Sequence, residues 1–299
     1  LQIQWRAANL AAVGSIPMYS RHKFALCARN NETRAESGPA LGEKSNMALV
    51  NTLGFIATVI VNALANALPI NGMTTGEISD AYPNLFTPPG FTFAVWGVIY
   101  LALAAFVLYQ LGVLGDSRER VMSARSRVGW WFAVSCAANI GWILLWHHQM
   151  VAMSVVVMIV LLASLAAIWR SLRIGSELSG RARAFGAVPF SIYLGWISVA
   201  TIANVSALLV DLGWNGFGLS EQLWAVIMIV VALALTSWFV LSQRDAAFGL
   251  VVAWAFTGIL VKHLTVFESS YMGVVVAAAA SIAAIAIEVI ISLSRKPSR

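Results

Sequence analysis

The chain has few charged residues and few cysteines. Asp, Glu, Lys and Arg make up 11% of its 299 residues, whereas hydrophobic residues make up 60%. An ordinary soluble domain carries about 25% charged residues, so this composition excludes that class. Cys27 lies in a polar tail and Cys136 in the middle of a hydrophobic run, which argues against a disulfide. Without a CxxC motif or a Cys/His cluster, the sequence predicts neither a zinc site nor a thiol redox site.

Motifs of catalysis and of phosphate binding are also missing. The sequence has no phosphate-binding loop and no nucleophile with a base at a known spacing, so the residues themselves indicate no enzyme activity. His147 and His148 are adjacent and point in different directions on a helix, so we expect no metal ligation. The net charge of +6 follows from membrane orientation and from contact with anionic lipid headgroups, and no separate basic face predicts a nucleic-acid partner.

Hydrophobic runs of about 20 residues dominate what is present, and this length crosses the core of a lipid bilayer as a helix. The runs lack the alternation of a barrel strand, so we predict an all-α, polytopic membrane bundle of about eight helices. The predicted spans are 47–68, 91–111, 128–147, 150–169, 185–210, 222–241, 246–262 and 271–293.

Basic residues alternate between the predicted loops. They occur between spans two and three, four and five, and six and seven, and again after span eight, whereas the opposite loops hold almost none. Lys and Arg collect in cytoplasmic loops, so we place both termini in the cytoplasm and the protein in the cytoplasmic (inner) membrane of a bacterium. Lys262 is the exception, and its long stem can reach the interface from a helix end.

Two segments differ from the spans. Residues 1–46 are polar apart from a short apolar patch, and Met47 opens the first hydrophobic run. We therefore expect 1–46 to be a disordered or misassigned N-terminal tail, with a targeting segment as the alternative. The loop 69–90 is the longest outside the membrane, and it is either a lid or a connector that caps helix ends.

Four spans carry polar or aromatic side chains at helical spacing, which places them on one face of each helix. Interhelical hydrogen bonds and interfacial belts explain many such residues. However, Trp96, Trp142 and Trp196 lie too deep in their spans to be belt residues. A shared pocket lined by indoles suits a flat, apolar ligand. The four stripes are Asn51, Thr58, Asn62 and Asn66; Phe93, Trp96, Tyr100 and Val107; Ser135, Asn139, Trp142 and Trp146; and Pro189, Tyr193, Trp196, Ala200 and Asn204.

Three motifs resemble the TspO/MBR family, the tryptophan-rich sensory proteins related to the mitochondrial translocator protein or peripheral benzodiazepine receptor. Residues 86–100, FTPPGFTFAVWGVIY, resemble its proline-rich entry to helix two followed by VWxxxY. Asn139-Ile-Gly-Trp142 resembles its NxxW in helix three. Residues 189–204 resemble its helix-five signature of Pro-aromatic, Trp, Ala-Thr and Asn. The order and spacing of the three motifs also agree.

The resemblance covers about residues 47–210 and implies a five-helix TspO-like core with a pocket under the loop between helices one and two. It implies binding of a porphyrin or another tetrapyrrole, a sterol or a benzodiazepine-type drug, with no required cofactor and no metal. Residues 211–299 add three transmembrane helices and a short cytoplasmic tail. The resemblance assigns the ligand site to Trp96, Tyr100, Asn139, Trp142, Trp196 and Ala200, and the stripes add Asn62, Tyr193 and Asn204.

Two departures from the family matter. Its members often carry Trp in the loop between helices one and two, whereas this loop has Tyr82 and Phe86, which argues against tryptophan-dependent porphyrin breakdown. The three additional helices either cover a surface that otherwise forms a homodimer or add a translocation path. We therefore expect a membrane sensor or carrier. The alternative is a transporter or permease subunit in which Glu288 couples to protons, unless this acid simply snorkels to the cytoplasmic surface.

Overall fold

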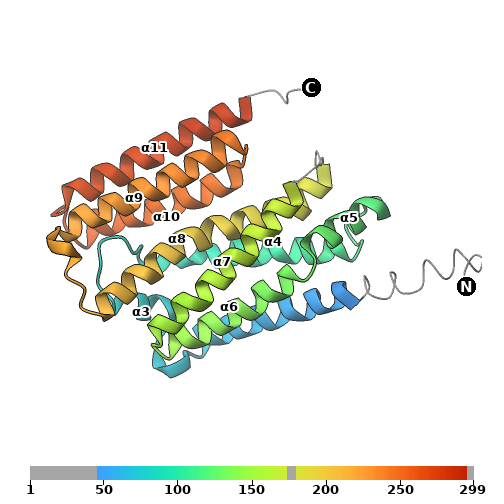
Figure 1. Ribbon diagram of the computed structural model, residues 1–299, viewed down its shortest axis with the longest axis horizontal. Helices are drawn as coiled ribbons and strands as arrows, with labels where there is room; N and C mark the ends of the chain where they lie inside the picture. Colours follow the sequence, from blue (N-terminus) through green and yellow to red (C-terminus); the bar gives the residue numbers. More distant parts are fainter. Residues whose placement is uncertain (1–45, 174–179, 295–299) are drawn as a thin grey trace, which may run out of the picture. The chain divides into compact units, whose positions relative to one another are not determined.

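The structure is a computed structural model that describes residues 46–173 and 180–294, and the elements in these residues are helical (Figure 1). Seven helices are long and apolar enough to cross a membrane, and one bent pair of helices makes an eighth span. The prediction of an all-α, polytopic membrane bundle is therefore confirmed. Residues from Ala48 onward form one compact unit. The predicted tails at 1–46, apart from Asn46, and at 295–299 lie outside the described residues.

The membrane helices follow the predicted spans within a few residues. Helix α10 continues to Thr265 instead of ending at Lys262, because the Lys262 ammonium group finds polar partners outside the helix and does not interrupt it. The first membrane helix is Asn46–Ala67, and the others are α4 (Val95–Gln110), α6 (Trp131–His147), α7 (Val151–Arg173), α8 (Val188–Asp211), α9 (Glu221–Ser237), α10 (Ala246–Thr265) and α11 (Met272–Ser294).

Short elements extend or connect these helices. The π-helical segments η3 (Ala182–Ala187) and η5 (Trp238–Ser242) extend α8 and α9, and the 3₁₀ turn η2 (Gly90–Ala94) leads into α4. Such irregular turns are common at helix ends. The loop after the first membrane helix contains the turn η1 (Ile70–Gly72) and helix α3 (Thr75–Asp80), and η4 (Gly216–Gly218) lies between α8 and α9.

The segment between the second and third spans, predicted as a loop, is the helix α5 (Arg118–Val128). Ser117 caps it by accepting a hydrogen bond from the Arg120 amide. Gly129 ends it with a φ of +55°, a conformation that glycine adopts without the steric cost of a Cβ atom. Helix α6 then begins at Trp131, bent by 50° from α5. The straight part of the third span, α6, is therefore shorter than the predicted 128–147.

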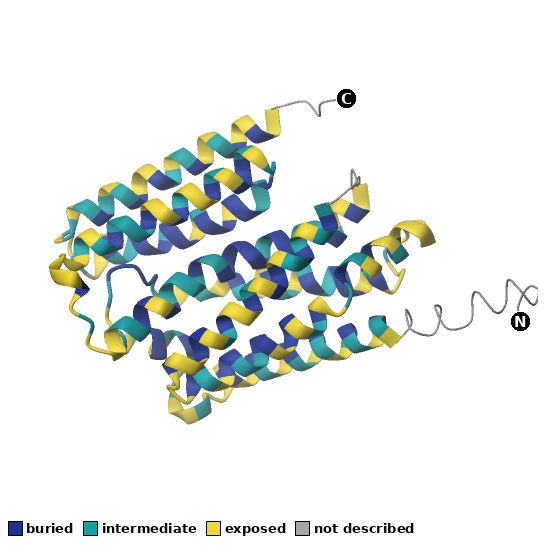
Figure 2. Ribbon diagram, in the orientation of Figure 1, coloured by how far each residue is buried: buried dark blue, intermediate teal, exposed yellow. Residues whose placement is uncertain are grey.

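Helix α8 is central and α11 is peripheral. In the apolar 18-residue stretch of each membrane span, 50% of the residues are buried for η3 and α8 and 28% for α11. Figure 2 shows long buried stretches on α8 and many exposed positions on α11. Helix α8 packs against α4, α7 and α10. The contact with α10 is close, because a Cβ atom on Gly195 would lie 3.0 Å from the Phe248 carbonyl oxygen. Glycine at this position lets the two helix backbones approach.

The basic connecting segments meet at one end of the bundle. Arg127 donates to the Ser171 carbonyl oxygen at 3.3 Å, and Arg173 forms an ion pair with Asp245 at 3.0 Å. Arg125 donates to the Gln110 carbonyl oxygen. Segments that the sequence assigned to one side of the membrane are thus bonded to one another, as the alternation of charges requires.

Candidate ligand-binding site

Three polar side chains from three helices form a buried chain of hydrogen bonds. Asn62 on the first membrane helix donates to the Asn139 side-chain oxygen of α6 at 2.7 Å. Asn139 donates in turn to the Tyr193 hydroxyl of α8 at 2.8 Å. All three side chains are buried, with Asn139 fully so. Hydrogen bonds between membrane helices fix their register and orientation, so this chain positions the three stripes that the sequence predicted.

A second polar group lies at Asn204 of α8. The Trp142 indole donates to the Asn204 side-chain oxygen at 2.9 Å, and Asn204 donates to the Ser154 hydroxyl of α7 at 3.0 Å. Sequence reasoning missed Ser154. The sequence feature that could have indicated it is a hydroxyl group within the aliphatic stretch 151–163, because a helix face that contacts only lipid needs no polar group.

Trp96 of α4 lies at the centre of an aromatic cluster. Its ring stacks on Tyr100, with centroids 5.6 Å apart, and on Trp142, at 6.3 Å. It also meets Tyr193 and Trp196 edge to face, at 5.7 and 6.3 Å. Stacked and edge-to-face arrangements are the favoured geometries of aromatic pairs. Trp96 therefore contacts both of the other deep tryptophans predicted to share a pocket with it.

Two partly open cavities and one groove adjoin this cluster. The first cavity has a volume of about 30 Å³, the second about 250 Å³, and the groove between the first membrane helix and α4 about 520 Å³. Phe93 and Trp96 line both cavities, while Val59 and Tyr100 line both the second cavity and the groove. The first cavity is also lined by Ser79, Thr87, Pro88, Trp196, Ala200 and Asn204.

Two hydrogen-bond donors in these walls have no partner among the described residues. They are the Trp196 indole nitrogen and the Tyr100 hydroxyl, and both atoms are buried. Buried polar atoms are nearly always hydrogen-bonded. An acceptor on a bound molecule in the adjoining cavity would satisfy Trp196, and one in the second cavity or the groove would satisfy Tyr100.

The loop after the first membrane helix is an ordered wall of the first cavity. Thr74 and Glu77 form a reciprocal capping box at the start of α3, and the hydrogen bonds from Thr74, the backbone one first, lower the pKa of Glu77. The Asn84 side-chain oxygen accepts from the amides of Phe86 and Thr87, at 3.0 and 2.8 Å. Since this loop supplies Ser79, Thr87 and Pro88 to the cavity, it covers the site, as the lid interpretation predicted.

The predicted site residues are therefore brought together. Asn62, Asn139 and Tyr193 form one polar chain, Trp142 bonds to Asn204, and the remaining residues line the cavities. The loop residues Thr87 and Pro88 were missed as site residues, although the proline-rich motif that contains them was recognised. His147, considered as a metal ligand, contacts the loop at the Thr75 hydroxyl, 3.1 Å from Nε2.

Glu288 has a partner that the sequence did not identify. The Ser237 hydroxyl of α9 donates to Glu288 Oε1 of α11 at 2.7 Å. The second carboxyl oxygen, Oε2, is buried without a partner in the described part of the chain. The acid thus connects α9 to α11, and its side chain is only partly exposed.

Fold and site together define a polytopic helical membrane protein with an aromatic, amide-bearing site between its helices. The chain matches the family model described as TSPO-like protein over residues 48–293, and it belongs to this family. The resemblance drawn from the three motifs is confirmed, and the match also includes α9, α10 and α11 beyond the five helices of the expected core. Comparisons with curated proteins and with solved structures find no match.

Proposed function

We propose that this protein is a membrane sensor or carrier that binds a tetrapyrrole, such as a porphyrin, between the first membrane helix, α4, α6 and α8. The observation that carries the proposal is the contact of Trp96 with four other aromatic rings beside two adjoining cavities. Indole and phenol faces attract flat, polarisable molecules, and the asparagines fix orientation.

The polar atoms of the site further restrict which ligands fit it. The Trp196 indole and the Tyr100 hydroxyl are buried donors without a partner among the described residues. A ligand that combines a large aromatic face with peripheral acceptors, as a porphyrin combines its ring with carboxylates, matches both features. A purely hydrocarbon ligand would leave the two donors unsatisfied.

The size of the site requires movement on binding. Pockets for small organic ligands measure about 300–1,000 Å³, and the two cavities measure about 30 and 250 Å³. The residues shared by both cavities, Phe93 and Trp96, are the side chains whose displacement would join them. On this proposal the structure corresponds to a closed form, and we expect binding to open the loop, to move Trp96, or both.

Titration of the purified protein with protoporphyrin IX, followed by tryptophan fluorescence, tests the proposal. We expect saturable quenching at micromolar ligand. Trp196→Ala should lower the affinity about thirtyfold or more, because losing a buried aromatic contact at a binding hot spot costs about 2 to 4 kcal/mol. Trp238→Ala is the matched control, since Trp238 is 46% exposed and lies outside the site.

Absence of saturable quenching in the wild-type protein would refute tetrapyrrole binding. Equal affinities of the two folded variants would place the ligand elsewhere.

We further propose that the bound porphyrin is recovered with an unchanged absorption spectrum, because the loop over the site presents Tyr82 and Phe86 and no tryptophan. For the orientation, we propose that the arginine-bearing end of the bundle faces the cytoplasm of a bacterium.

A further inference from the structure

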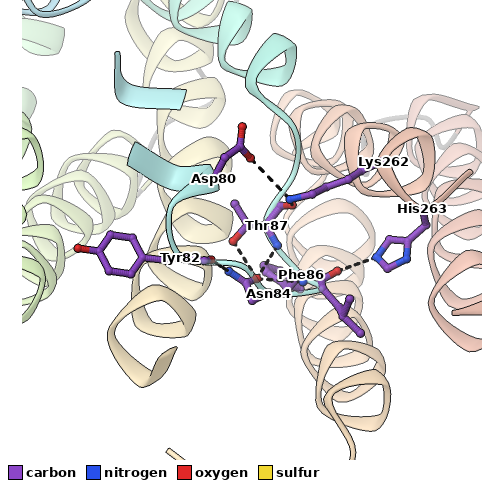
Figure 3. A network of polar contacts seen from close by, with 8 residues as sticks. Asp80, Tyr82, Asn84, Phe86, Thr87, Lys262 and His263 are labelled. Carbon is purple, nitrogen blue, oxygen red and sulfur yellow. Dashed lines mark hydrogen bonds and ion pairs between the residues drawn. The ribbon is translucent and has the colours of Figure 1, made fainter. Parts of the chain in front are cut away.

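Helix α10, one of the three additional helices, forms polar contacts with the loop that lines the first cavity (Figure 3). The Lys262 ammonium group donates to the Thr87 carbonyl oxygen at 3.1 Å and lies 3.8 Å from the Asp80 carboxylate. His263 Nε2 lies 2.9 Å from the Leu85 carbonyl oxygen. Because a carbonyl oxygen only accepts, Nε2 carries the proton. Two neighbouring side chains of α10 thus hold successive parts of the loop.

The contact continues along α10 toward the start of α4. The Trp254 indole donates to the Thr92 carbonyl oxygen at 3.0 Å. A Cβ atom on Gly258 would collide with the Thr92 side chain of η2 and would lie 3.1 Å from Pro88 of the loop. At Gly258 the backbone of α10 therefore packs directly against side chains of the loop and of η2, with no room for a bound molecule between them.

The same loop residues face the cavity on their other side. Thr87 and Pro88 line the first cavity together with Trp196, and Thr87 is 3% exposed. The turn between them and Tyr82 is held by Asn84, whose side chain bonds to backbone groups on both of its sides. The loop is thus internally braced at this turn. It is held to α6 at Thr75, by His147 and Trp146, and to α10 at Leu85 and Thr87.

We propose that α10 is the latch of the ligand site: Lys262 and His263 hold the 69–90 loop closed, so that release of these contacts opens the cavity. Lys262 and His263 are then positioning residues, since neither lines the described cavities. Only the effect of the latch on the rates of ligand binding and release rests on the proposed function. Its existence is a property of the unliganded protein and can be measured in it.

Cysteine accessibility measures opening without a ligand. Ser79 belongs to the loop, is 7% exposed and faces the first cavity, so Ser79→Cys in a background lacking Cys27 and Cys136 reports on opening. We expect Lys262→Met and His263→Phe each to raise the rate of modification by a small water-soluble thiol reagent about tenfold, the usual effect of losing one hydrogen bond to a charged or buried group.

Two further variants separate a latch from general loosening of the fold. Thr257→Val, also on α10, removes a hydroxyl that bonds within its own helix, to the Ala253 carbonyl oxygen, and should leave the rate unchanged. His263→Gln retains an amide donor and should restore a rate near that of the wild type. Rates unchanged in Lys262→Met and His263→Phe, or raised equally in Thr257→Val, would overturn the latch.

Stopped-flow mixing with protoporphyrin IX tests the consequence. If the latch must open for the ligand to enter and leave, Lys262→Met should raise the association and dissociation rate constants together, about tenfold each. The dissociation constant, which is their ratio, should then change less than tenfold. A rise in the dissociation rate alone would overturn this role. If the wild-type protein fails to bind protoporphyrin IX, the proposed function fails, whereas the thiol-modification rates still decide whether α10 holds the loop.

Discussion

Replacement of Asn139 by leucine tests whether the amide chain stabilises the core of the site. Asn139 is fully buried on α6 and is the middle member of the chain, since it accepts from Asn62 at 2.7 Å and donates to Tyr193 at 2.8 Å. Leucine has the same number of side-chain heavy atoms and the same branching at Cγ, and it can make neither bond. The substitution therefore removes two interhelical hydrogen bonds without creating a large cavity.

The expected loss follows from these contacts. A hydrogen bond between membrane helices contributes about 0.6 kcal/mol on average and up to about 1.7 kcal/mol. Asn62 keeps its second bond, to the Thr58 carbonyl oxygen at 2.9 Å, whereas the Tyr193 hydroxyl loses the bond from Asn139 and belongs to a residue that is 2% exposed. With the cost of an unsatisfied buried group added, we expect Asn139→Leu to lower the free energy of unfolding by about 1 to 3 kcal/mol.

Unfolding in mixed micelles with increasing dodecyl sulfate, followed by circular dichroism, gives this free energy. The control is Asn66→Leu, since Asn66 is exposed and bonds only within its own helix, to the Asn62 carbonyl oxygen; it should change stability by less than about 0.5 kcal/mol. A double-variant cycle with Tyr193→Phe should show coupling of about 0.6 kcal/mol or more. A loss below about 0.5 kcal/mol for Asn139→Leu would refute the stabilising role of the chain.

Three further predictions use the same kinds of measurement. Gly195→Leu should cost about 1 to 3 kcal/mol in the micelle assay, because its side chain would collide with the Phe248 backbone, whereas Gly97→Leu, with nothing within 4 Å of a Cβ atom, should be tolerated. Single cysteines at the exposed positions Ser126 and Ala81 should react with an impermeant maleimide from opposite sides of the membrane, and labelling of both in intact cells would contradict the topology. Glu288→Gln should retain its bond from α9 and change stability by less than about 0.5 kcal/mol; a larger loss would show that the negative charge itself is needed.

Sequence reasoning captured what depends on periodicity. Residues three or four apart must share a helix face, so the stripes through Asn62, Trp96, Asn139 and Tyr193 were visible before their partners were known. The lengths of the apolar runs likewise predicted the spans, because bilayer thickness limits them. The family resemblance then indicated that the stripes belong to one site, a step that periodicity alone does not supply.

Features that depend on contacts between distant segments were not predictable in the same way. The few apolar residues of α5 lie among arginines, so the sequence predicts a charged loop there. The apolar residues are buried only because α4, α7 and η3 pack beside this helix. Ser79 illustrates a second limit. Its place in a polar loop outside the predicted spans indicates an exposed side chain, but Ser79 is 7% exposed and lines the first cavity. Ala81, which is exposed, is therefore the better position for labelling.

The additional helices are attached to the ligand-binding helices at both ends of α10. At its start, the buried Asp245 carboxylate accepts from the Trp169 indole at 2.6 Å and from the Ser191 hydroxyl at 2.7 Å, and it pairs with Arg173 at 3.0 Å. At its other end, Lys262 bonds to the loop over the site. A buried, multiply bonded carboxylate is destabilised strongly when its partners are removed. Because α10 is anchored firmly at its start, and α3 is bonded to α6 through Thr75, the segment 85–88 is the part of the loop that release of Lys262 and His263 would free.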